Sequence, residues 1–231
     1  TLPSSGQDKS VIAIRTIESR AFLKHLITFE NVLPSIMAAK SYDSESKKIL
    51  FNQEIYNENN GAWVRKSVKN QQSKPSYIEA YSTYLNQVSI SKDQMTNIIT
   101  ISVEHISPIF AKELLDLIIR EANELLRNKD LRESYDAIAF LTSEIPKSSL
   151  ITMKDAISQL LQSTLETQMM AKISTEYILK VIEPPFVPEQ RSRPSRAFIC
   201  ILGTLAGGMF AILWVLIRHY SLRIMKQDID L

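Results

Sequence analysis

The residues that most often carry chemistry in proteins are few in this chain. The three histidines, His25, His105 and His219, lie in different segments, and none has a second ligand at metal-binding spacing. The sequence contains neither an HExxH nor a CxxC pattern, which would bring zinc ligands together. The single cysteine, Cys200, lies in an apolar run and has no adjacent base that would activate it as a nucleophile. We therefore predict no metal site and no covalent catalysis.

Phosphate chemistry and glycoside hydrolysis find little more support. Gly6 is followed by a lysine and a serine, but the upstream glycine of a phosphate-binding loop is missing. Glu121, Glu124 and Glu133 lie on a charged helical surface, and we interpret them as solvated. A pair of glycosidase carboxylates is the weaker alternative. We expect no enzymatic activity and no cofactor, which is typical of a scaffold.

The element that would organise the chain is an apolar run near its C-terminus. Residues 197–217 contain no charge, and a helix of that length would cross the roughly 30 Å hydrocarbon core of a bilayer. The run predicts a transmembrane helix, with a buried core helix as the alternative. Three of the five glycines, Gly203, Gly207 and Gly208, fall inside it. Gly203 and Gly207 share one helix face, so they either mediate a helix–helix contact or are simply tolerated.

A proline-rich and basic connector, residues 184–196, precedes this run. Pro184, Pro185, Pro188 and Pro194 are four of the nine prolines in the chain. Because proline fixes its own backbone and restricts the residue before it, we expect a stiff, extended connector.

Residues 1–190 carry 21 Lys and Arg against 23 Asp and Glu, so this part lacks the excess of positive charge that is typical of a nucleic-acid-binding domain.

Hydrophobic periodicity predicts two long helices, over residues 107–145 and 151–174. Ser107 and Pro108 are a favourable helix start. Charges stand at i,i+4 spacing along the first helix, such as Asp116 with Arg120 and Arg132 with Asp136, and we interpret them as a solvated face. Alternating apolar residues predict strands from about residue 96 to 105 and over 175–183.

The second long helix has an unusual polar face. Between Asp155 and Lys172 the only charged residue is Glu166, and the other polar residues are Ser, Gln and Thr. An exposed helix normally carries Lys and Glu, so this face is either packed within its own protomer or covered by a neighbouring copy. The residues that would form such an interface between protomers are Gln159, Gln162, Ser163 and Glu166.

Several of these features occur together in a known family. The residues TEYILKVIEPPFVPEQRSRPSRA, with LGTLAGGM following in the apolar run, combine a strand pattern, a proline-rich linker, a basic cluster and a glycine-rich span. The residues IESRAFLK from Ile17, with Leu33 and Pro34, match the pattern of an early helix. The chain resembles the Wzz family of O-antigen chain-length determinants, the class 1 polysaccharide co-polymerases.

The resemblance implies an architecture. We expect an α/β (α+β) membrane-proximal base with a long projecting helical hairpin, a C-terminal transmembrane helix, and a ring of identical protomers. Residues 1–190 would form the periplasmic domain and residues 218–231 a cytoplasmic tail, at the bacterial inner membrane. The family's first transmembrane helix is absent from this chain, and we expect it ahead of Thr1.

The resemblance also implies a function without catalysis. Such proteins set the length to which the polymerase Wzy extends undecaprenyl-linked O-antigen repeats, so the expected partners are Wzy, that glycan, the lipid bilayer and other copies of the chain. Two alternatives stay open: a membrane-tethered periplasmic sensor or receptor domain, and a co-polymerase for another surface polysaccharide such as common antigen or exopolysaccharide.

Overall fold

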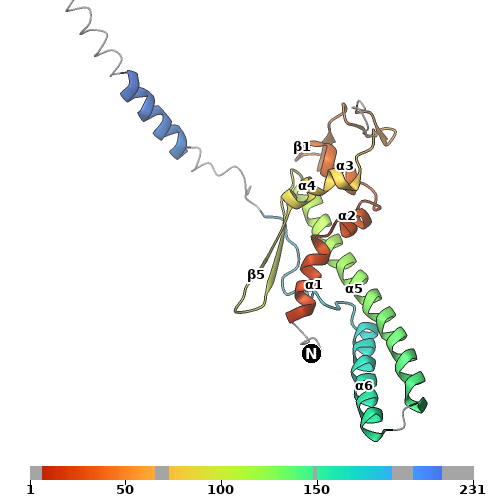
Figure 1. Ribbon diagram of the computed structural model, residues 1–231. Helices are drawn as coiled ribbons and strands as arrows, with labels where there is room; N and C mark the ends of the chain where they lie inside the picture. Colours follow the sequence, from red (N-terminus) through yellow and green to blue (C-terminus); the bar gives the residue numbers. More distant parts are fainter. Residues whose placement is uncertain (1–6, 66–72, 148–149, 189–199, 215–231) are drawn as a thin grey trace, which may run out of the picture. The chain divides into compact units, whose positions relative to one another are not determined.

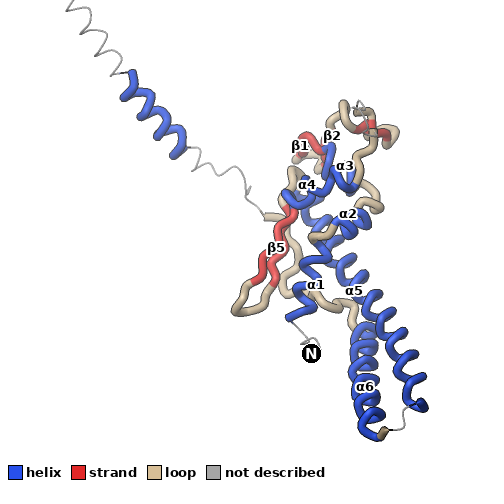
Figure 2. Tube along the Cα trace, viewed as in Figure 1, coloured by secondary structure: helices blue, strands red, loops and turns tan. Residues whose placement is uncertain are grey.

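The computed structural model describes residues 7–65, 73–147, 150–188 and 200–214 of the 231-residue chain. It separates into two compact units, Thr1–Val187 and Pro188–Leu231. Helices make up most of the first unit, and its strands are short (Figures 1 and 2).

Four short helices come from the N-terminal part of the first unit. They are α1 (Gln7–Ile17), α2 (Arg20–Leu26), α3 (Val32–Ala38) and α4 (Tyr77–Gln87). Serine side chains begin two of them: Ser19 accepts a hydrogen bond from the Phe22 amide, and Ser76 accepts one from the Glu79 amide. Such caps satisfy amides that have no partner inside the helix, so the local sequence fixes where α2 and α4 start.

The strands of the described residues form three separate antiparallel pairs. They are β1 (Ala39–Asp43) with β2 (Lys48–Phe51), β3 (Tyr56–Asn57) with β4 (Ala62–Trp63), and β5 (Val88–Lys92) with β6 (Ile99–Val103). The strand predicted from about residue 96 corresponds to β6. The predicted strand over 175–183 is wrong, because these residues form no strand ladder in the structure. The expected α/β base is therefore corrected to a helical base that carries three small hairpins.

Helix α5 (Pro108–Glu144) connects this base to a helical hairpin. Ser107 caps it through a 3.2 Å hydrogen bond from the Phe110 amide, and Pro108 occupies its first turn. Its first half enters the hydrophobic core at regular four-residue spacing, through Phe110, Leu114, Ile118, Ala122 and Leu126. Its second half extends beyond the core, so the buried apolar contacts of α5 with the base come from its first half (Figure 1).

Helix α6 (Ile151–Ile173) returns antiparallel along the second half of α5, after the short helix η1 (Ile145–Lys147). The least exposed positions of α6 recur about every three or four residues: Ile157, Leu161, Thr164, Thr167, Gln168 and Ala171. This spacing keeps one seam of a helix facing its partner, as in coiled coils. The two helices lie where the sequence periodicity predicted them, and they form the projecting hairpin.

The described part of the second unit is a helix over residues 200–214. At about 1.5 Å per residue these described residues extend roughly 22 Å. Within the described ranges, no helix is both long and apolar enough to cross a membrane, so the predicted transmembrane helix over 197–217 is corrected. Residues 197–199 and 215–217 of that prediction, and the predicted tail over 218–231, lie outside the described residues.

The glycine prediction falls on the same helix. A Cβ atom added at Gly203, Gly207 or Gly208 would meet nothing within 4 Å. No other element of the described structure lies against these glycines, and the helix–helix contact stays a prediction.

Candidate functional site

The most densely organised polar region of the first unit lies at the root of the hairpin. Residues 174–188, here called the return segment, leave the end of α6 and run back along α5 (Figure 1). Side chains from α1 and α5 hold this segment in place, and a groove lies between α5 and the segment.

Asn123 fixes the backbone of the return segment. Its side-chain amide donates to the carbonyl oxygen of Leu179 at 2.9 Å. Its side-chain oxygen accepts from the amides of Ile178 at 3.0 Å and Leu179 at 2.8 Å. Asn123 is 5% exposed, so these three bonds form away from water. They satisfy backbone groups that a β-ladder would otherwise have to satisfy, which explains why residues 175–183 are not a strand.

A second cluster ties the same segment to α1. Lys9 Nζ donates to Asp130 Oδ2 at 3.0 Å and to Tyr177 OH at 2.9 Å. Tyr177 OH donates to the same Asp130 oxygen at 2.6 Å, and Lys9 Nζ lies 4.9 Å from the centre of the Tyr177 ring. Burial opposes the charge on Lys9, but the hydrogen bonds to Tyr177 and Asp130 outweigh it and raise the pKa of Lys9. Burial and the Asp130 carboxylate raise the pKa of Tyr177, so its hydroxyl stays protonated as a donor.

Glu121 forms a third cluster on the side of α5 that faces α2. Its side chain is 8% exposed, with one oxygen 2.8 Å from His25 Nε2 and the other accepting from Arg120 Nε at 3.0 Å. The interpretation of Glu121 as solvated is therefore wrong. Glu124 is exposed, and Glu133 is exposed with its carboxylate 3.8 Å from Lys129.

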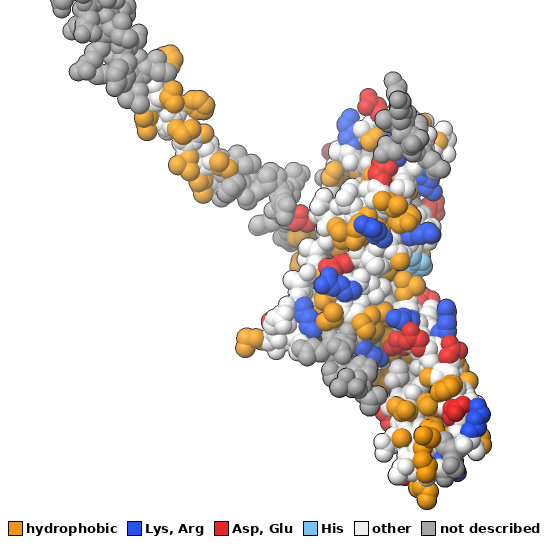
Figure 3. Space-filling model, in the orientation of Figure 1, with side chains coloured by type: hydrophobic (Ala, Val, Ile, Leu, Met, Phe, Trp, Pro, Cys, Tyr) orange, Lys and Arg blue, Asp and Glu red, His pale blue; other side chains and the backbone are white. Residues whose placement is uncertain are grey.

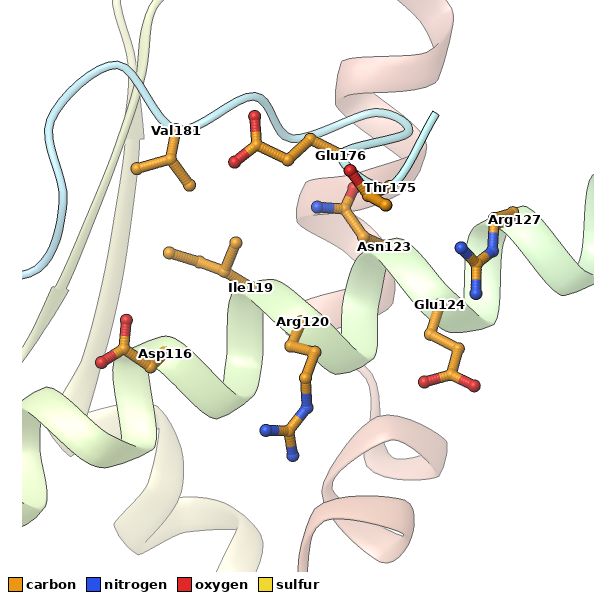
Figure 4. A pocket seen from close by; sticks show the side chains of 9 residues that line it. All are labelled: Asp116, Ile119, Arg120, Asn123, Glu124, Arg127, Thr175, Glu176 and Val181. Atoms are coloured by element: carbon orange, nitrogen blue, oxygen red, sulfur yellow. The ribbon is translucent and has the colours of Figure 1, made fainter. Parts of the chain in front are cut away.

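A groove of about 280 Å³ lies between α5 and the return segment (Figure 4). Three carboxylates and two guanidinium groups lie around it, together with a small apolar patch in which Ile119 points toward Val181 (Figure 4). Its nine lining residues are Asp116, Ile119, Arg120, Asn123, Glu124, Arg127, Thr175, Glu176 and Val181.

The charged side chains of this groove do not neutralise one another by direct pairing. Among the described residues, no ion pair within 4.0 Å joins Arg120 or Arg127 to Asp116, Glu124 or Glu176, and Arg120 instead pairs with Glu121. The side chains of Asp116, Arg120, Arg132 and Asp136 are all exposed, as expected for a solvated face of α5. Both signs of charge are thus presented to the groove.

The outward face of α6 is the second candidate surface. Gln159, Gln162, Ser163 and Glu166 are all exposed. Gln162 donates to Glu166 at 3.1 Å, and Ser163 donates back to a carbonyl oxygen of its own helix. Near the end of the same helix Met169 is 57%, Met170 58% and Ile173 76% exposed. Figure 3 shows apolar side chains gathered over the lower part of the hairpin.

The connector is only partly described. Pro184 and Pro188 are exposed and Pro185 is half-buried, in a stretch without helix or strand, whereas Pro194 lies outside the described residues.

Metal-ligating groups do not cluster within the described ranges: no group of three or more His, Cys, Asp or Glu could hold an ion.

Sequence reasoning missed Lys9, Asn123 and Tyr177. The position of Asn123 could have indicated a structural role, because it is a polar residue on the same helix face as Ile119 and Leu126, which pack in or against the core. Nothing in the sequence pairs Asn123 with residues 178 and 179, because the partners lie 55 and 56 positions away.

No family model matches the chain, and no curated protein matches it.

Proposed function

We propose that this chain is a non-enzymatic scaffold that regulates the length of O-antigen chains, acting with the polymerase Wzy on undecaprenyl-linked glycan. The proposal begins from the resemblance of residues 177–208 to the Wzz family. The same resemblance suggests a position at the bacterial inner membrane with most of the chain in the periplasm.

The observation that carries the proposal is the helical hairpin of α5 and α6. Its root is anchored in the core, and its second half extends beyond the base, so a long side surface of α6 is free to meet other molecules. A scaffold needs such a surface more than it needs a deep pocket.

The composition of that surface favours other copies of this chain as its partner. Uncharged polar side chains at Gln159, Gln162 and Ser163 can be covered at a lower cost than lysines or glutamates, because burying an unpaired charge is far more expensive. The exposed apolar side chains of Met169 and Ile173 would gain from being covered. A helix with this composition suits an interface between protomers.

An assembly of copies provides a physical route to length control. Identical surfaces repeated around a ring would hold the growing polymer or the polymerase at several equivalent positions. The time that the polymer stays in contact, and hence its final length, would then depend on an intact ring.

The test introduces charge into the proposed interface. Gln159→Glu with Gln162→Glu would bury like charges beside Glu166, at a cost on the order of several kcal/mol per ion when no partner is available. We expect smaller oligomers by mass photometry in detergent and an altered glycan-length distribution on a lipopolysaccharide gel. The matched control is Asn128→Glu with Thr142→Glu, at two exposed positions of α5.

Two results would contradict the proposal. Intact oligomers and unchanged glycan in the α6 variant would show that this face of α6 is exposed to solvent in the assembled protein. Unchanged lipopolysaccharide after deletion of the gene would remove O-antigen length regulation itself.

A further inference from the structure

We propose that the groove between α5 and the return segment binds the glycan directly, as a site for a hydroxyl-rich oligosaccharide with little net charge. This inference rests on the proposed function and gives it a specific contact surface on the first unit.

The charges of the groove select the class of ligand. Asp116, Glu124 and Glu176 supply acceptors, whereas the guanidinium groups of Arg120 and Arg127 supply only donors. A sugar hydroxyl both donates and accepts, so neighbouring hydroxyls can engage carboxylates and guanidinium groups in turn. A phosphate or a polyanion would meet three carboxylates against two guanidinium groups, which disfavours it.

The same charged groups are available to a ligand because they do not pair with one another. Within the described residues, Arg127 has no carboxylate within 4.0 Å, although Glu124 lies in the preceding turn and Glu176 lines the same groove. Arg120 donates from Nε to Glu121, and its guanidinium carbon lies 5.9 Å from the centre of the Phe29 ring. A ligand could therefore reach Arg127 without breaking an existing ion pair, whereas Arg120 would keep its pair with Glu121.

Shape and rigidity agree with a sugar. Ile119 and Val181 form an apolar patch that suits the C–H face of a pyranose ring (Figure 4). The volume of about 280 Å³ is near the lower end of ligand pockets, roughly 300 to 1,000 Å³, and suits one or two sugar rings. Asn123 fixes the wall of the groove through its bonds to the return segment, so the site is largely formed before the ligand arrives.

The test uses the purified full chain and the O-antigen polysaccharide released by mild acid from the lipopolysaccharide of the source strain. Binding is measured by isothermal titration and by saturation-transfer NMR. We expect Arg127→Gln and Glu176→Gln each to weaken binding about tenfold, because each removes one charge-assisted hydrogen bond. Arg132→Gln, an exposed α5 position outside the groove, should stay within about twofold of the wild type.

Three outcomes would overturn the site: no saturable binding by the wild-type chain, equal binding by the Arg127→Gln and Arg132→Gln variants, or full displacement of the polysaccharide by inorganic pyrophosphate. Circular dichroism of each variant checks that its helices are intact.

The deletion strain separates this inference from the proposed function. Altered O-antigen without polysaccharide binding would remove the glycan site and keep length regulation. Polysaccharide binding with unchanged O-antigen would keep the glycan site and remove length regulation.

Discussion

Replacing Asn123 with alanine should destabilise the first unit strongly. The change removes three hydrogen bonds and leaves two amides and one carbonyl of residues 178 and 179 without their partner. At a net value of about 1 kcal/mol per bond the loss is about 3 kcal/mol. Because the amide of Leu179 is buried, its desolvation would bring the total to about 3 to 5 kcal/mol. A domain whose whole stability is about 5 to 15 kcal/mol would lose a large part of it.

The free energy of unfolding would be measured by urea titration followed by far-UV circular dichroism. Asn128→Ala is the matched control, because it makes the same change at an exposed position of the same helix. It also carries the same gain in helix propensity, about 0.5 kcal/mol, which can be subtracted. Amide hydrogen exchange at residues 178 and 179 should speed up only in the Asn123 variant. A difference between the two variants below about 1 kcal/mol would refute the assignment of Asn123 as the residue that holds the return segment.

His105 accepts a hydrogen bond from the Ser107 amide at Nδ1, and its Nε2 lies 2.9 Å from the Ser35 carbonyl oxygen, so the fold needs the neutral imidazole. Burial lowers the pKa of His105 below its usual value near 6.5. Because the unfolded chain binds the proton more readily, the stability of the wild type should fall as the pH drops below about 6.5. The His105→Gln variant should therefore show a flatter dependence of the urea midpoint on pH between about pH 7 and 5.5. Parallel curves of urea midpoint against pH for the two proteins would contradict this. Tyr177→Phe removes the hydroxyl that joins Lys9 and Asp130 and should cost about 1 to 2 kcal/mol in urea unfolding, whereas a wild-type midpoint would mean that Lys9 and Asp130 suffice alone. Leu114→Ala, at a core position that is 1% exposed, should cost about 2 to 5 kcal/mol, against less than about 1 kcal/mol for Leu85→Ala at a position 40% exposed; equal losses would argue against this core.

Features that depend on neighbouring residues could be predicted from the amino-acid sequence alone. Ser107 and Pro108 start α5 because a serine oxygen can reach an amide three residues ahead and proline suits the first helical turn. The helical periodicity of α5 and α6 and the alternation of β6 are also local, so both the long hairpin and that strand were predicted close to where they lie.

Features that depend on residues far apart in the chain are set by tertiary contacts. The alternation of Tyr177, Leu179 and Val181 is a good strand pattern, but Asn123 satisfies the backbone there, and no local rule contains that contact. Glu121 has the composition of a solvated helix residue and is nevertheless buried, because His25 from α2 and Arg120 meet its two oxygens. A periodic pattern predicts which face of a helix or strand is buried, because apolar side chains avoid water. Which residues pack against that face depends on contacts between distant parts of the chain.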